Sequence, residues 1–150
     1  PDWPMDIETT HAFQPIQFGE YTITPILATH KEDEECHNLI VYDGEKTFLY
    51  GTDTGVWKEE TWAFLQAVRL DGIALECTEG SVDSGYSGHL NLKRMVDVIQ
   101  RLRADGILRR DAYACSTHHS HNGDMTYAEL VEALAPYGIE AGFDGLEFTL

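Results

Sequence analysis

The chain contains 150 residues, of which 43% are hydrophobic and 24% charged, a composition ordinary for a globular domain with its own core. Its 26 acidic and 10 basic side chains give a formal net charge of −16. This charge argues against nucleic acid as a partner, because that binding depends on Lys and Arg displacing condensed counterions. The sequence contains no apolar run of membrane-helix length and no signal-peptide pattern at its start, so we expect a cytoplasmic protein without a membrane partner. Three widely spaced cysteines, Cys36, Cys77 and Cys115, fit reduced and packed thiols in that compartment.

The apolar pattern predicts strands first and then alternating strands and helices. Residues 1–13 carry two prolines and little periodicity, which indicates a lead-in loop. Strands are expected at 15–18, 21–29, 38–42, 47–50, 72–77, 111–115, 139–142 and 146–150, and helices at 58–68, 90–104 and 125–135. Asp43-Gly44 is a hairpin turn signal, and Gly106 is a candidate C-cap. This order predicts an α/β fold with a mixed β-sheet and flanking helices, in a single domain over residues 1–150.

One turn gathers residues that bind metals. His118, His119, His121 and Asp124 lie between the strand expected at 111–115 and the helix expected at 125–135. Neutral imidazole is the commonest nitrogen ligand for zinc, manganese and iron. Loops that follow strands are also where α/β enzymes place their chemistry. The turn therefore predicts a metal site, although any one of these histidines could equally be a solvated loop residue.

Four residues at the edges of predicted elements could meet in space. His30, Asp53 and His118 each follow a predicted strand, and His89 comes directly before the strongest predicted helix. Strand ends of one sheet can converge, so two histidines and an aspartate could coordinate a metal from a rigid frame. Each residue also has a simpler interpretation: Asp53 could form an Asx-turn, His30 could be solvated, and His89 could have no partner.

The order and spacing of several short motifs resemble those of a known protein family. These are Thr29-His30, Tyr50-Gly51-Thr52-Asp53-Thr54-Gly55, Gly88-His89-Leu90-Asn91, Thr117-His118-His119-Ser120-His121 and Gly142-Phe143-Asp144-Gly145. Over about residues 23–150 the series resembles the metallo-β-lactamase fold hydrolases, and within them the branch containing phosphoribosyl cyclic phosphodiesterase. The resemblance implies an αββα sandwich.

The same resemblance implies roles for individual residues. His30 matches a ligand of one metal, His118 a ligand of a second, and Asp53 the carboxylate that bridges both. His89 matches an active-site histidine that contacts the phosphate and protonates the leaving group. His121 and Asp144 match positions for which only a supporting role is expected.

The chain departs from this family in one respect. The signature His-x-His-x-Asp-His, which lies upstream and supplies the remaining ligands, is absent, and residues 119–124 only imitate it. The chain therefore resembles the C-terminal half of such a hydrolase. Half a sandwich leaves one apolar sheet face uncovered, so we expect the chain to pair with its N-terminal half or with another copy.

The resulting hypothesis is part of a binuclear hydrolase acting on a small anionic ester, a phosphodiester with cyclic phosphate as one candidate. Two divalent ions, zinc, manganese or iron, would hold a bridging hydroxide and neutralise charge on the phosphate oxygens. With three ligands the chain alone should bind metal weakly and turn over little or not at all. The alternative is a non-catalytic interaction domain of the same fold, whose histidines serve structure. A nucleic-acid-processing enzyme is disfavoured by the charge.

Overall fold

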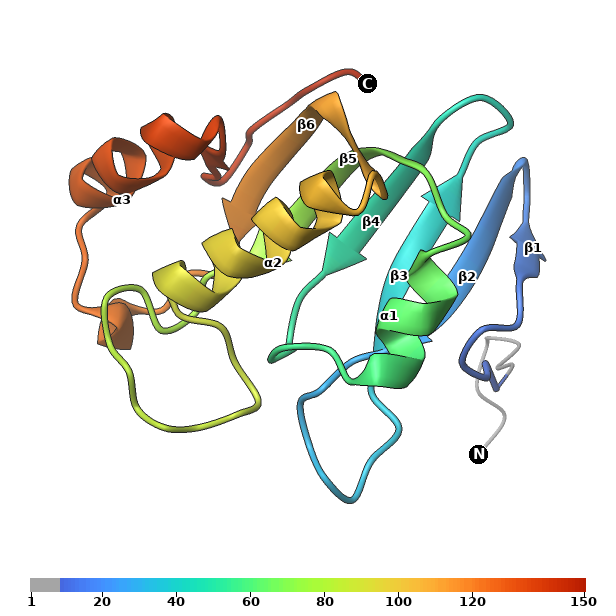
Figure 1. Ribbon diagram of the computed structural model, residues 1–150, viewed down its shortest axis with the longest axis horizontal. Helices are drawn as coiled ribbons and strands as arrows, with labels where there is room; N and C mark the ends of the chain where they lie inside the picture. Colours follow the sequence, from blue (N-terminus) through green and yellow to red (C-terminus); the bar gives the residue numbers. More distant parts are fainter. Residues whose placement is uncertain (1–8) are drawn as a thin grey trace, which may run out of the picture.

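The computed structural model describes residues 9–150, which build one seven-stranded sheet whose strands lie in chain order (Figure 1). The strands are β1 (Ile16–Phe18), β2 (Tyr21–Leu27), β3 (His37–Tyr42), β4 (Thr47–Gly51), β5 (Leu70–Glu76), β6 (Leu108–Thr117) and β7 (Glu140–Ala141). Strands β1 to β4 pair antiparallel, and β4 to β7 pair parallel. The mixed sheet expected from the sequence is confirmed.

Turn chemistry accounts for the β3–β4 hairpin. The Asp43 carboxylate accepts the backbone N–H groups of Glu45 and Lys46, at 2.8 and 2.7 Å. These bonds hold the pKa of Asp43 below its ordinary value. Gly44 has φ of 102°, a conformation that only glycine adopts at no steric cost. The Asp43-Gly44 turn is therefore where the sequence predicted it.

Three α-helices flank the sheet: α1 (Glu59–Leu65), α2 (Leu92–Ala104) and α3 (Tyr127–Leu134), with short 3-10 helices η1 (His121–Gly123) and η2 (Ala135–Tyr137). The α2 helix begins later than predicted because Asn91 caps it, its side chain accepting the N–H of Arg94. It ends at Ala104 with Asp105 as its C-cap, and Gly106, with φ of 70°, takes the left-handed position just after the cap.

The other two helices are also shorter than predicted. The α1 helix stops at Leu65 because Ala67 and Val68 continue in tighter i→i−3 turns. The α3 helix starts after Thr126, which forms a capping box with Glu129. Local capping thus sets the ends that apolar periodicity alone does not specify.

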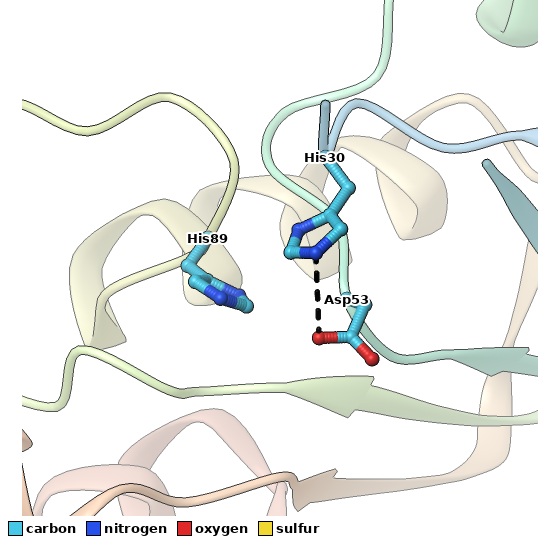
Figure 2. Close-up of side chains that lie close together, drawn as sticks. All are labelled: His30, Asp53 and His89. Atoms are coloured by element: carbon cyan, nitrogen blue, oxygen red, sulfur yellow. Dashed lines mark ion pairs between the residues drawn. The ribbon is translucent and has the colours of Figure 1, made fainter. Parts of the chain in front are cut away.

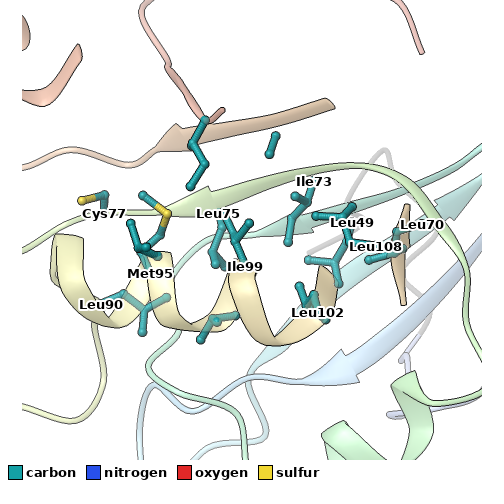
Figure 3. Close-up of a cluster of buried hydrophobic side chains, with 14 of the residues drawn as sticks. Leu49, Leu70, Ile73, Leu75, Cys77, Leu90, Met95, Ile99, Leu102 and Leu108 are labelled. Carbon is teal, nitrogen blue, oxygen red and sulfur yellow. The ribbon is translucent and has the colours of Figure 1, made fainter. Parts of the chain in front are cut away.

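Helices α1 and α2 lie on the same face of the sheet (Figure 1). Strands β4, β5 and β6 are parallel and adjacent in sequence, and right-handed crossovers that all step in one direction place their helices on one side. The core lies between this face and the helices (Figure 3). It joins sheet residues such as Leu49, Ile73 and Leu75 to Ile99 and Leu102 of α2, all fully buried.

The opposite face of the sheet is largely uncovered by helices. Register brings Tyr50, Ala74 and Cys115 into one row on this face, and Tyr50 is 45% exposed. Phe18, on the edge strand, is 69% exposed. A hollow of about 710 Å³ lies over this face between β4 and the C-terminal segment.

The strand predicted at 146–150 is wrong. This segment pairs with no strand and instead lies across the uncovered face. The Phe148 ring stacks on Tyr113 at 4.3 Å between centroids and lies 5.4 Å from Phe48. Phe148 remains 42% exposed, so stacking of its ring on Tyr113 and Phe48, and not full burial, takes the place of backbone pairing here.

The prediction for 1–13 falls largely outside the described residues, and the described part, 9–13, contains no strand or helix. Within residues 9–150, no helix is long and apolar enough to cross a bilayer. The three cysteines are unpaired; Cys77 and Cys115 are buried and Cys36 is half-buried.

Thiol reactivity should follow this burial. Burial raises the pKa of Cys77 to about 12 and raises that of Cys115 above its ordinary value. Because the thiolate is the reactive form, an aromatic disulfide reagent at pH 8 should label Cys36 rapidly and the other two only after denaturant is added. Stopped-flow absorbance measures the two phases. A fast phase that survives in Cys36→Ser would contradict the buried placement.

Candidate metal centre

The sheet brings the C-terminal ends of three strands to one edge. Strands β2, β4 and β6 all run in the same direction, since β2 and β4 are each antiparallel to β3 and β6 is parallel to β5. His30 follows β2, Asp53 follows β4, and His118 directly follows β6. The convergence predicted for strand ends is therefore present.

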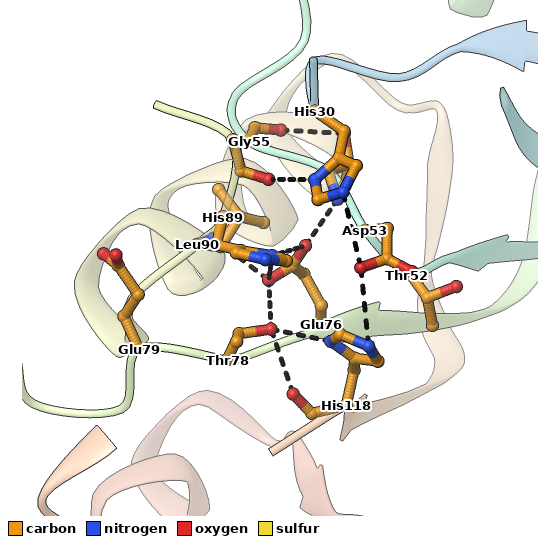
Figure 4. A network of polar contacts seen from close by, with 12 residues as sticks. His30, Thr52, Asp53, Gly55, Glu76, Thr78, Glu79, His89, Leu90 and His118 are labelled. Carbon is orange, nitrogen blue, oxygen red and sulfur yellow. Dashed lines mark hydrogen bonds and ion pairs between the residues drawn. The ribbon is translucent and has the colours of Figure 1, made fainter. Parts of the chain in front are cut away.

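At this edge one carboxylate oxygen lies between two histidines (Figure 4), and Figure 2 shows its ion pair with the first of them, His30. Asp53 Oδ1 is 3.8 Å from His30 Nε2 and 3.5 Å from His118 Nε2. The ring centroid of His89 lies 4.9 Å from that of His30 and 5.7 Å from that of His118. His30, Asp53 and His89 each offer one ligand atom, all within 4.8 Å of one another. The structure thus brings together all four residues singled out by the sequence.

The hydrogen bond of His30 defines which of its nitrogens is available. Its Nδ1 lies 3.0 Å from the Gly88 carbonyl oxygen, which can only accept, so Nδ1 carries the hydrogen. In the neutral imidazole, Nε2 then presents a lone pair toward Asp53. A backbone or carboxylate partner on the far nitrogen is the usual arrangement behind a metal-binding histidine.

Asp53 and His118 share an unusual backbone conformation. Their φ angles are 51° and 54°, in the left-handed region that non-glycine residues rarely adopt. Among the hydrogen bonds of residues 9–150, none joins the Asp53 carboxylate to a backbone N–H, so it does not form the Asx-turn considered as an alternative. Such strain concentrates at functional sites, where surrounding structure holds the residue in place.

Glu76 is the residue of the site that the sequence analysis missed (Figure 4). It ends β5 with a side chain that is 0% exposed. Its carboxylate accepts the N–H groups of Thr54 and Leu90 and the Thr78 hydroxyl, and both of its oxygens lie 3.0 Å from His89 Nδ1. The available signal was an acidic residue at the end of an otherwise apolar strand, since a buried charge requires partners.

Glu76 also belongs to a second group of convergent ligand atoms, with His89 and His118. Its oxygens already accept four donors, however, so coordination of a cation would require breaking bonds to a buried carboxylate. The structure therefore favours Glu76 as the group that orients His89, and the oxygen of Asp53 as the ligand.

Close backbone approaches fix the loops that carry these residues. A Cβ atom on Gly55 would lie 1.7 Å from the Ser87 carbonyl oxygen, and one on Gly88 would lie 2.4 Å from the His30 carbonyl oxygen. Only glycine permits this packing. The segment that precedes His89 therefore packs directly against His30 and against the loop that follows Asp53.

The remaining polar residues of the predicted turn lie apart from this cluster. His119 Nε2 lies 2.9 Å from the buried Ser116 hydroxyl, and burial lowers the pKa of His119 below its ordinary value, with His118 adding to the effect. His121 begins η1, and Asp124 follows that helix. Asp144 lines the hollow on the uncovered face. Of the predicted cluster, only His118 reaches Asp53.

Comparison with known proteins identifies the sequence family of the chain. The sequence profile described as "Beta-lactamase superfamily domain" matches residues 3–119. No curated protein sequence matches the chain.

Several solved structures share the fold. The metallo-beta-lactamase fold protein YhfI from Bacillus subtilis is 19% identical with a TM-score of 0.68; the match covers 91% of this chain and 53% of that one. Zn(2+)-bound PqqB from Methylobacterium extorquens is 11% identical with a TM-score of 0.69, covering 95% and 55%. Isothiocyanate hydrolase from Delia radicum gut bacteria is 20% identical with a TM-score of 0.69, covering 97% and 62%.

The chain thus spans little more than half the length of these structures. The profile match covers most of the sequence, and the same architecture recurs in the solved structures. The chain belongs to the beta-lactamase superfamily and has the metallo-β-lactamase fold, whose members are typically metal-dependent hydrolases.

Proposed function

We propose that this chain forms part of a binuclear metal centre that hydrolyses a small anionic ester, a phosphodiester with cyclic phosphate as one candidate. The observation that carries the proposal is the position of one Asp53 oxygen within 4 Å of Nε2 atoms from two histidines that follow separate strands. Nitrogen and carboxylate donors of this kind suit zinc, manganese and iron, and divalent ions in such a site supply Lewis acidity and an activated water.

The three proposed ligands, His30, Asp53 and His118, would have different roles at the metal ions. His30 and His118 would each hold one ion through Nε2. Asp53 would contact both ions, because the carboxylate oxygen that faces the two histidines has more than one lone pair to offer. Its side chain is half-exposed, which leaves room for a substrate beside it. Coordination by His30 is supported by the Gly88 carbonyl, which keeps the hydrogen on Nδ1.

His89 is the proposed proton donor to the leaving group. Glu76 accepts the His89 Nδ1 hydrogen and fixes the plane of the ring, so that Nε2 is free to carry the transferred proton. The His89 ring also lies edge-on to Tyr86, at 5.7 Å between centroids, which limits its rotation. A positioned imidazole beside the ligand histidines suits acid catalysis at a phosphate ester.

Completion of this site calls for a second piece of protein. Three ligands are too few for two ions, and the chain spans 53–62% of the solved structures that it resembles. The uncovered sheet face, with Phe18 and Tyr50 exposed, supports pairing with the N-terminal half of the same fold or with another copy. The chain alone should then bind metal weakly and show little turnover. Unpaired thiols are compatible with the cytoplasm as the compartment.

A non-catalytic interaction domain is the competing function. The exposed aromatic face favours it, because contiguous apolar surface marks a protein-binding site whether or not catalysis takes place. It offers no reason for the convergence of His30, Asp53, His89 and His118 on one point. The two functions therefore differ in what they require of Asp53.

Asp53→Ala should remove metal binding and hydrolysis together. We expect zinc affinity to fall at least about 100-fold, beyond the 10–100-fold typical of outer-shell residues. Competition with a chromogenic chelator measures this in the purified chain. Hydrolysis of bis(p-nitrophenyl) phosphate, measured after mixing with the candidate N-terminal half, should fall to background. Asp33→Ala, an exposed aspartate outside the cluster, is the matched control. Activity absent from the reconstituted wild type would favour the interaction domain.

Glu76→Gln should weaken both the fold and the site. The introduced amide group would place N–H atoms against the donors that Glu76 now satisfies, at a cost of about 1–3 kcal/mol in the free energy of unfolding. Urea denaturation followed by circular dichroism measures the change. Glu132→Gln, on the exposed side of α3, should leave stability unchanged. Equal stability of the two variants would show that the Glu76 hydrogen bonds are not what holds this edge together.

A further inference from the structure

We propose that Thr78 is a positioning residue that selects the tautomer of His118, keeping the hydrogen on Nδ1 and leaving Nε2 bare toward Asp53. The inference rests on the proposed metal centre for its purpose, but not for its geometry. Thr78 lies just after β5, two residues beyond Glu76, and contacts both Glu76 and His118 (Figure 4).

The single hydrogen of the Thr78 hydroxyl determines the direction of its hydrogen bonds. The Thr78 hydroxyl oxygen lies 2.5 Å from Glu76 Oε2, 2.8 Å from His118 Nδ1 and 3.0 Å from the His118 carbonyl oxygen. A hydroxyl carries one hydrogen, while a carboxylate and a carbonyl can only accept. If Thr78 donated to Nδ1, both oxygen contacts would lack a hydrogen. The hydroxyl therefore donates to an oxygen and accepts from Nδ1–H.

This arrangement mirrors that of His30 by different means. His30 Nδ1 donates to a backbone carbonyl, that of Gly88, whereas His118 Nδ1 donates to a side-chain hydroxyl. In the neutral rings, both histidines consequently present Nε2 lone pairs to the same Asp53 oxygen. A side-chain substitution can remove the hydroxyl that accepts from His118, but not the backbone carbonyl that accepts from His30.

The backbone around Thr78 keeps the hydroxyl in place. Glu76 and Thr117 are register partners of β5 and β6, and the Cys77 N–H donates to the Thr117 carbonyl at 2.9 Å. Strands β5 and β6 end at this register pair, so Thr78 and His118, which follow them, lie next to each other. Thr78 also joins His118 to the carboxylate that orients His89, which links the two histidines through a chain of hydrogen bonds.

The test compares Thr78→Val, which keeps the shape but lacks the hydroxyl, with Thr78→Ser, which keeps the hydroxyl. Long-range ¹H–¹⁵N NMR of the metal-free protein reports the His118 tautomer, assigned with His118→Asn. We expect Nδ1–H in wild type and in Thr78→Ser, and a substantial Nε2–H population in Thr78→Val. Thr149→Val, at the opposite end of the sheet, is the control and should match wild type.

Zinc affinity gives the second readout. Removal of an outer-shell partner typically costs about 10–100-fold in metal affinity, so Thr78→Val should lose that much and Thr78→Ser should not. Chelator competition measures it, with circular dichroism confirming that each variant is folded.

The tautomer result decides the inference. Nε2–H in the wild type would overturn it without recourse to any variant, and so would Nδ1–H retained in a folded Thr78→Val. A wild type that holds the expected tautomer but binds no zinc, alone or after mixing with the candidate N-terminal half, would overturn the proposed function and leave the positioning role of Thr78 supported.

Discussion

The site depends on one buried carboxylate and on the requirement that its charge be satisfied. Glu76 accepts hydrogen bonds from three separate segments: one follows β4, one follows β5 and one precedes α2. An ionised group without such partners would be very costly to bury, so the segments must close around it for the fold to form. The loops that carry Asp53 and His89 are therefore held in place by the electrostatics of the interior, while the ligand atoms themselves remain accessible.

Two elements of the fold follow readily from local sequence. The stripe of α2 is periodic enough to identify the helix, and Asp43-Gly44 has the chemistry of its turn. Residues 146–150 have the apolar pattern of a strand, yet they lie across a sheet face. That outcome depends on the rings of Phe48 and Tyr113, which are distant in sequence. A local pattern contains no information about which surface is left uncovered.

The site shows the same division. His30, Asp53, His89 and His118 could be grouped because strand ends meet at one edge and because their spacing resembles that of a known family. Glu76 and Thr78 could not, since a single acidic residue in an apolar strand does not reveal its partners. Their roles arise from hydrogen bonds to His89 and His118, which are 13 and 40 residues away. The three histidines at 118, 119 and 121 suggested one cluster, but the left-handed turn at His118 directs the chain so that only the first reaches Asp53.

The order of the strands has a consequence for how the chain acquires its structure. Each strand pairs with the one that precedes it in sequence, from β1 to β7. A polypeptide emerging from the ribosome could therefore add one strand at a time to a growing edge, without waiting for a distant segment or inserting between strands already paired. The longest delays would fall at the parallel steps, where a helix must form before the next strand can arrive. Until β7 closes the series, the exposed edge at each stage is the point most open to aggregation or to chaperones.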